Sequence, residues 1–140
     1  MARAPRWFWG AAVALLLWSL AGIAAFAAHL SVDATALARM PADDAAAFRA
    51  LPPWFVYAFA LATLPALFGA VALLARRRGA VPLYALALIG AVIQFGYVLG
   101  ATDLLARKGG GAAVLPAVII ALGMVSLWLA RHDAARGWLR

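Results

Sequence analysis

The sequence predicts an all-α membrane protein, a bundle of four transmembrane helices with both termini in the cytoplasm. Of its 140 residues, 68% are apolar and only 12% are charged. A soluble domain typically has about 45–50% apolar and about 25% charged residues. The apolar residues gather in four stretches, 7–28, 54–75, 81–102 and 112–130. Each can cross about 30 Å of hydrocarbon as a helix, so we expect residues 1–140 to form a single transmembrane domain.

The first stretch is interpreted as a permanent span rather than as a signal peptide. Arg3 and Arg6 precede it, and Ala25-Phe26-Ala27 near its end resembles a signal-peptidase site. The apolar run of about 22 residues, however, exceeds the roughly 7–15 residues of a signal core. It also carries several tryptophans, which are typical of the membrane interface.

The loop over residues 30–51 is the longest segment outside the four stretches. Ser31 or Asp33 is positioned to cap a first short helix, and Asp43 and Asp44 after Met40-Pro41 indicate the start of a second. Pro52-Pro53 ends the loop and leads into the second stretch.

The second and third stretches are predicted to be antiparallel neighbours, because only a short arginine-rich segment joins them. Pro65 lies near the middle of the second stretch, where a proline removes the backbone hydrogen bond to Leu61 and favours a kink. Gly96 and Gly100 in the third stretch have the spacing of a small-residue contact. We expect this glycine pair to contact another helix of the same bundle, with a dimer as the alternative.

The orientation follows from the excess of basic residues in cytoplasmic segments. With the amino terminus inside, the inner segments hold eight basic residues and the outer segments hold four. The inner set is Arg3, Arg6, Arg76, Arg77, Arg78, Arg131, Arg136 and Arg140, and the outer set is Arg39, Arg49, Arg107 and Lys108.

A small polar site is predicted between the first and third stretches. Gln94 and Tyr97 share a helical face with small residues, and Ser19 and His29 share a face of the first stretch. A primary amide in the bilayer is costly unless it is hydrogen-bonded. We therefore expect Ser19, Gln94 and Tyr97, together with Thr63 of the second stretch, to form a polar pocket with His29 at its outer mouth. The alternative is that Gln94 bonds a neighbouring helix and serves packing alone.

No pattern indicates catalysis, a cofactor or a metal. There is no cysteine, which excludes thiolate sites and disulfides. His29 and His132 fall at opposite faces of the membrane, and no charged residue lies well inside a predicted stretch. The net charge of +7 is concentrated at the ends of the stretches, as expected for contact with membrane lipids and not with nucleic acid. We predict that the protein is not an enzyme.

Several short patterns occur in a characteristic order along the chain. They are Trp18-Ser19-Leu20-Ala21-Gly22, Pro53-Trp54, Ala58-Phe59-Ala60, Pro82-Leu83-Tyr84, Leu88-Ile89-Gly90 with Gln94 and Tyr97, and Gly137-Trp138-Leu139. In this respect the chain resembles a group of small four-span proteins of the bacterial inner membrane that are often labelled sugar transporters. The resemblance implies a multi-pass protein of that membrane. Ser19 departs from the group, in which asparagine is expected at this position.

Three functions remain open at this point. The first is binding or transport of a small neutral solute, with several copies of the chain forming any conducting path. The second is an accessory or structural role in a larger membrane complex, which fits the small extramembrane surface. The third and least favoured is a membrane enzyme acting on a lipid or quinone, because no buried acid, base or metal set is visible.

Overall fold

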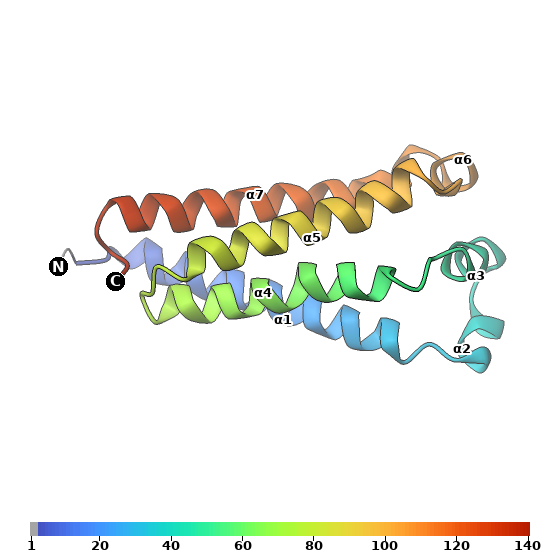
Figure 1. Cartoon of the computed structure of the whole chain (residues 1–140), viewed down its shortest axis with the longest axis horizontal. Coiled ribbons are helices and arrows are strands. Elements are labelled where there is room, and N and C mark those ends of the chain that lie inside the picture. The colour runs from blue at the N-terminus through green and yellow to red at the C-terminus, as the bar shows by residue number, and fades with distance from the viewer. Residues whose placement is uncertain (1–2) are drawn as a thin grey trace.

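The computed structural model describes residues 3–140 as an all-α bundle of four long helices (Figure 1). This confirms the predicted all-α bundle of four long helices, whereas the cytoplasmic position of both termini stays a prediction. The long helices are α1 (Arg6–Leu30), α4 (Phe55–Leu74), α5 (Ala80–Gly100) and α7 (Val114–Ala135). The short elements are α2 (Ala34–Arg39), α3 (Ala42–Arg49), α6 (Leu104–Lys108) and the 3₁₀ turn η1 (Gly110–Ala113).

All four long helices are long and apolar enough to cross a membrane. They are apolar around most of their circumference, and large side chains such as Leu17 and Trp128 remain more than half exposed. A helix that is apolar on all sides suits a lipid environment, because water would face the same side chains at a high cost. The chain is therefore described as a multi-pass membrane protein.

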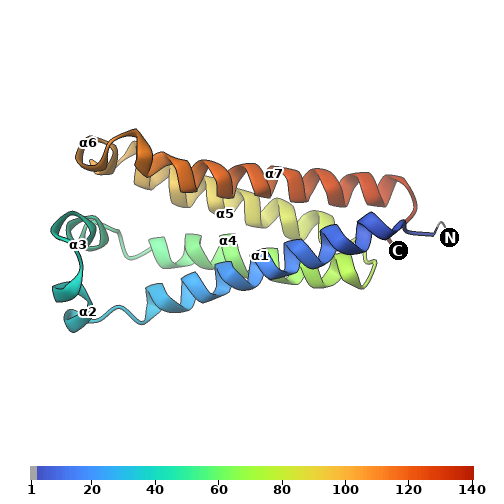
Figure 2. The same cartoon turned by 180° about the vertical axis from the view of Figure 1, so that it is seen from behind.

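The helices lie in the order α1, α4, α5, α7, with the main packing contacts between successive members of that series. Figures 1 and 2 show the start of α1, segment 137–140 and the α4–α5 hairpin at one end of the bundle. We call this the terminal end. The helices α2, α3 and α6 lie at the opposite end, which we call the loop end.

The two short helices predicted in the first long loop are present as α2 and α3. Asp33 caps α2, because its carboxylate accepts a hydrogen bond of 2.8 Å from the backbone N–H of Ala36. Ser31 does not cap α2, since its hydroxyl instead donates to the carbonyl of Ala27 in α1. Asp43 and Asp44 lie in the first turn of α3, where carboxylates are favoured by the helix dipole.

The centre of the bundle depends on a close backbone contact between α4 and α5 at Gly90. A Cβ atom at this position would lie 2.5 Å from the backbone nitrogen of Ala62 and 2.6 Å from the carbonyl carbon of Leu61. Only glycine fits such a contact. Pro65 lies one turn further along α4, which continues through it as one helix. Because proline has no N–H, the Leu61 carbonyl beside Gly90 lacks its usual helical donor.

The glycine pair Gly96 and Gly100 is not used within the bundle, contrary to expectation. Both residues are exposed, and a Cβ atom at either position would meet nothing within 4 Å. The reason is rotational, because Gly90 already turns the buried face of α5 toward α4 and leaves Gly96 on another face. The small-residue contact that the sequence predicted is made by Gly90 instead.

Segment 137–140 folds back to close the terminal end. Gly137 ends α7 with a φ of 74°, the left-handed conformation that glycine adopts readily. The backbone N–H of Arg78 then donates to the Arg140 carbonyl (2.7 Å), and the N–H of Arg140 donates to the Arg76 carbonyl (2.6 Å). These bonds tie the segment to the α4–α5 hairpin and bury Leu139 in the apolar core.

The Gly90 contact predicts a specific sensitivity to a single methyl group. Gly90→Ala is expected to lower the free energy of unfolding by about 1–3 kcal/mol, because the added Cβ must displace a backbone. Gly96→Ala is the matched control in the same helix and should stay within about 0.5 kcal/mol of the parent. Equilibrium unfolding in mixed micelles, followed by circular dichroism, measures both. Equal effects of the two substitutions would contradict the proposed contact.

Candidate functional site

A cavity of about 230 Å³ lies among the four long helices. Three of its thirteen lining residues are polar, namely Ser19 of α1, Thr63 of α4 and Gln94 of α5. The other lining residues are apolar or aromatic and include Leu115 and Ile119 of α7. We call this space the central cavity.

The two hydroxyl groups of the central cavity are already hydrogen-bonded to the backbone. Ser19 Oγ donates to the Leu15 carbonyl at 2.7 Å and also lies 3.3 Å from the Ala66 carbonyl of α4. Thr63 Oγ1 donates to the Phe59 carbonyl at 2.9 Å. Such back-bonding satisfies a hydroxyl on an apolar helix, so neither group needs a ligand.

Gln94 differs from these hydroxyl groups. Its side chain is 4% exposed and borders the central cavity. Within residues 3–140 its amide makes no hydrogen bond, although it carries two N–H donors and a carbonyl acceptor. Leaving a buried polar group unpaired costs about 1–3 kcal/mol. The sequence analysis gave a hydrogen bond from Gln94 to a neighbouring helix as the alternative role of this residue. Within residues 3–140 no such bond is made.

The other two residues of the predicted pocket lie elsewhere. The Tyr97 ring packs edge-on against Trp54, with ring centroids 5.0 Å apart, and does not border the central cavity. Tyr97 follows Gln94 by three residues, so on an ideal helix the two side chains point in directions about 60° apart. This difference turns Tyr97 away from the central cavity. The structure therefore brings Ser19, Thr63 and Gln94 together around one cavity. The predicted direct contact between the first and third stretches is not a main packing contact, because α4 packs between α1 and α5.

His29 lines a second space nearer the loop end, which we call the outer cavity. This cavity has a volume of about 330 Å³ and is bordered by residues of α1, α3, α4 and α5. The His29 ring lies 5.0 Å from Phe48 and 5.1 Å from Phe59. Phe59 borders both cavities, so its ring stands between His29 and the space beside Gln94.

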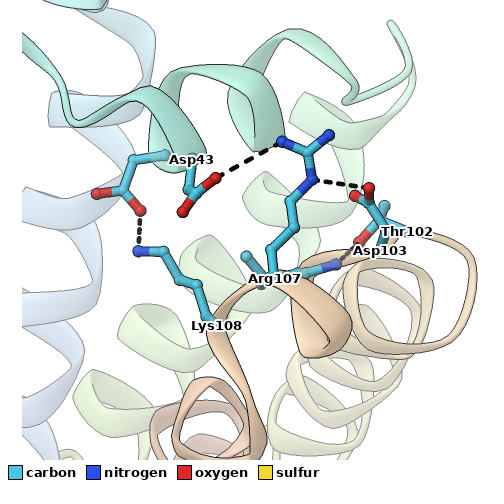
Figure 3. Close-up of polar contacts among 7 residues, drawn as sticks. Asp43, Thr102, Asp103, Arg107 and Lys108 are labelled. Carbon is cyan, nitrogen blue, oxygen red and sulfur yellow. Dashed lines mark hydrogen bonds and ion pairs between the residues drawn. The ribbon is translucent and has the colours of Figure 1, made fainter.

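Ion pairs between α3 and α6 join the loop end (Figure 3). Arg107 Nε donates to Asp103 Oδ2 at 2.7 Å, and Arg107 Nη1 lies 3.7 Å from Asp43 Oδ1. Lys108 pairs with Asp44, which also borders the outer cavity. The sequence analysis missed these pairs. The sequence feature that could have predicted them is a pair of adjacent acids, Asp43 and Asp44, in one outer loop and a pair of adjacent bases, Arg107 and Lys108, in the other.

A buried carboxylate at the terminal end was also missed. The predicted fourth stretch stopped at residue 130, but α7 continues to Ala135 and brings Asp133 to 0% exposure. Asp133 lies beyond the predicted stretch, in the last turn of α7, so the expectation that no charged residue lies well inside a stretch is not contradicted, but the burial of this carboxylate was not foreseen. Helical spacing could have predicted this burial. Asp133 follows the buried residues Ser126, Leu129 and Ala130 at intervals of three and four residues, which place it on the same face of α7.

Asp133 is accompanied by a cluster of aromatic rings. Asp133 Oδ1 lies 3.2 Å from His132 Nδ1, while Oδ2 has no hydrogen-bond partner within the described part of the chain. The His132 ring stacks on Trp128 at 5.2 Å and also contacts Trp138 and Trp7 at 5.5 and 6.1 Å. His132 therefore packs between α1, α7 and segment 137–140. Throughout residues 3–140, no three His, Cys, Asp or Glu side chains gather as metal ligands.

The ion pair of α6 predicts a pH-dependent change at the loop end. The hydrogen bond from Arg107 lowers the pKa of Asp103 below its ordinary value. A carboxylate whose pKa is lowered by folding stabilises the fold above its unfolded pKa, and this contribution is lost as the pH falls through the folded pKa. The Arg107 amide, which donates to the Asp103 carbonyl, should therefore exchange its hydrogen faster, after correction for intrinsic rates, on acidification.

Asp103→Asn provides the control for this measurement. The variant cannot titrate at position 103, so this acid-dependent step in exchange protection should disappear. The same step in both proteins would assign it to another carboxylate.

Comparisons of the chain with protein-family models, with curated proteins and with solved structures each found no match. The function is therefore argued from the geometry of the two cavities and the chemistry of the residues around them.

Proposed function

We propose that this multi-pass membrane protein binds a small neutral molecule in the central cavity through the amide of Gln94. One observation carries the proposal: the amide of Gln94, a residue only 4% exposed, has no hydrogen-bond partner within residues 3–140 and borders a cavity whose other walls are almost entirely apolar. A bound molecule that offers a hydrogen-bonding atom to Gln94 would remove the cost of the unpaired amide.

The lining of the cavity supports a neutral ligand. None of the lining residues is Asp, Glu, Lys, Arg or His. A charged ligand would lose its hydration without gaining a counter-charge, which is strongly unfavourable in an apolar environment. The volume of about 230 Å³ lies just below the roughly 300–1,000 Å³ of typical ligand pockets. A small molecule, or one segment of a longer one, is therefore the appropriate occupant.

The packing supports binding more directly than transport through one chain. The terminal half of the bundle is filled by an apolar core that includes Phe8, Leu73, Tyr84 and Leu129. This core lies between the central cavity and the terminal end. We therefore assign any transport activity to an oligomer, in which a path runs between chains.

The proposal includes a location and an orientation. Eight of the twelve basic residues, identified above from the sequence, belong to segments at the terminal end. The positive-inside rule favours a cytoplasmic position for that end. The resemblance to small four-span proteins supports the bacterial inner membrane. In this orientation the outer cavity and the α3–α6 ion pairs face away from the cytoplasm.

A second candidate function is that of an accessory subunit in a larger membrane complex. The exposed pair Gly96 and Gly100 favours it, because small residues allow another transmembrane helix to approach closely. Native mass spectrometry of protein extracted gently from its own membrane distinguishes the two candidates. A stoichiometric protein partner supports the subunit role, whereas a chain or homo-oligomer that retains a small molecule supports binding.

The binding proposal is tested by Gln94→Leu, for which two opposite effects are expected. The ligand-free protein should gain free energy of unfolding, by at most about 1–3 kcal/mol, because an unpaired amide on a largely buried side chain is removed. The extracted protein should at the same time lose its bound small molecule. Unfolding in micelles and native mass spectrometry measure the two effects.

Tyr97→Phe is the matched control, since it removes a polar group of the same helix outside the cavity. It should change neither quantity. If Gln94→Leu instead lowers the stability of the ligand-free protein, Gln94 makes a structural hydrogen bond and the proposal fails.

A further inference from the structure

The few polar groups that line the central cavity limit which kind of ligand can bind there. Among the described residues that line the cavity and are buried, Gln94 alone has a polar group without a hydrogen-bond partner, whereas Ser19 and Thr63 donate to backbone carbonyls and can only accept from a ligand. A ligand with few hydrogen-bonding atoms and a large apolar surface matches this lining, in which three of thirteen residues are polar. A polyhydroxylated solute would leave several hydroxyls unpaired, at about 1–3 kcal/mol each. The cavity therefore fits an apolar molecule with a single hydroxyl or carbonyl group.

The arrangement of the outer helices indicates where such a molecule enters. Helix α1 packs on α4, and α7 packs on α5, with little direct packing between α1 and α7. Figure 2 shows α1 and α7 diverging from the terminal end toward the loop end. Ring contacts of Trp7 with His132 and Trp138 hold them together at the terminal end. The α1 and α7 backbones therefore lie further apart beside the central cavity than at the terminal end.

The residues of the cavity wall at this gap face outward. Trp18 of α1 is 39% exposed and Leu115 of α7 is 61% exposed, and both border the central cavity. They belong to helices that are apolar enough to cross a membrane, so their exposed surfaces contact lipid. The wall of the cavity thus includes residues of α1 and α7 that are exposed on the apolar surface of the bundle.

The route from the aqueous loop end is obstructed by comparison. The Phe59 ring separates the outer from the central cavity and contacts Phe26 at 5.2 Å and His29 at 5.1 Å. Beyond it, the ion pair between Lys108 and Asp44 joins α6 to α3 beside the outer cavity. A water-soluble ligand from the loop end would have to pass the Phe59 ring, which a membrane-dissolved ligand entering between α1 and α7 does not meet.

We infer that the ligand of the central cavity is a neutral amphiphile dissolved in the membrane, with an apolar body and one hydrogen-bonding group, which enters between α1 and α7 and bonds to Gln94. This inference rests on the proposed function and adds to it the class of ligand and the direction of access. The expected ligand is therefore a molecule dissolved in the lipid phase and not a water-soluble solute such as a sugar.

The test uses the full chain in nanodiscs of synthetic phosphatidylcholine and a long-chain alcohol that carries a photoreactive diazirine. Cross-linking to cavity residues is mapped by peptide mass spectrometry, with 1-dodecanol, dodecane and glucose as unlabelled competitors. We expect 1-dodecanol to displace the probe, dodecane to be about tenfold weaker because it lacks the hydrogen bond, and glucose to have no effect. Gln94→Leu should weaken probe binding by a similar factor of about ten.

Two substitutions in α7 test the direction of access. Ile119→Trp places a large ring on the cavity wall between α1 and α7 and should sharply reduce cavity labelling. Met124→Trp adds the same ring to an exposed position outside the cavity and should leave labelling unchanged. Equal labelling of the two variants would overturn access between α1 and α7.

The remaining outcomes separate this inference from the proposed function. If glucose binds with a dependence on Gln94 and the alcohol does not, the lipid-phase ligand is excluded while binding in the cavity stands. If dodecane and 1-dodecanol compete equally, the hydrogen bond to Gln94 is excluded. If no probe binds with a dependence on Gln94, the proposed function fails together with the inference.

Discussion

The contact between the α4 and α5 backbones at Gly90 is the constraint on which the rest of the bundle depends. It brings α5 within a distance of Leu61 and Ala62 that no Cβ atom would permit. A contact this close fixes the rotation of α5, so that Ala87, Gly90 and Gln94 face inward together. Gln94 follows Gly90 by one helical turn and is buried beside α4 for this reason. The outer helices α1 and α7 then pack on either side of the α4–α5 pair.

The two ends of the bundle are held by different interactions. At the terminal end, aromatic rings, the apolar core and the backbone bonds of segment 137–140 join α1, α4, α5 and α7. At the loop end, the bonds between α3 and α6 are exposed ion pairs, which are screened by salt and contribute little to stability. Both cavities lie away from the filled terminal half. The molecule is thus tightly packed in its terminal half and contains its two described cavities nearer the loop end.

This distribution bears directly on function. A membrane protein that moves ions typically carries ionisable groups along its path, and the central cavity is lined by none. What the cavity offers is apolar surface and one unpaired amide, which together suit a neutral molecule. The buried Asp133 lies at the opposite end of the bundle beside His132, and the apolar core separates it from Gln94. The two polar features are therefore independent elements of the structure.

The sequence by itself determined the four apolar helices, the short helices of the first outer loop and the α4–α5 hairpin, because these depend on local length, hydrophobicity and capping. It also singled out Gln94 as a polar residue that needs a hydrogen-bond partner within the membrane. Only the tertiary structure decided that Gln94 is unpaired, that Tyr97 and His29 lie outside the central cavity, that Gly90 rather than Gly96 makes the close contact, and that Asp133 is buried. The physical reason is that lipid is as apolar as the helix surfaces, so hydrophobicity does not mark which face of a transmembrane helix turns inward. That choice depends on shape complementarity between helices, which the order of residues in one helix does not reveal.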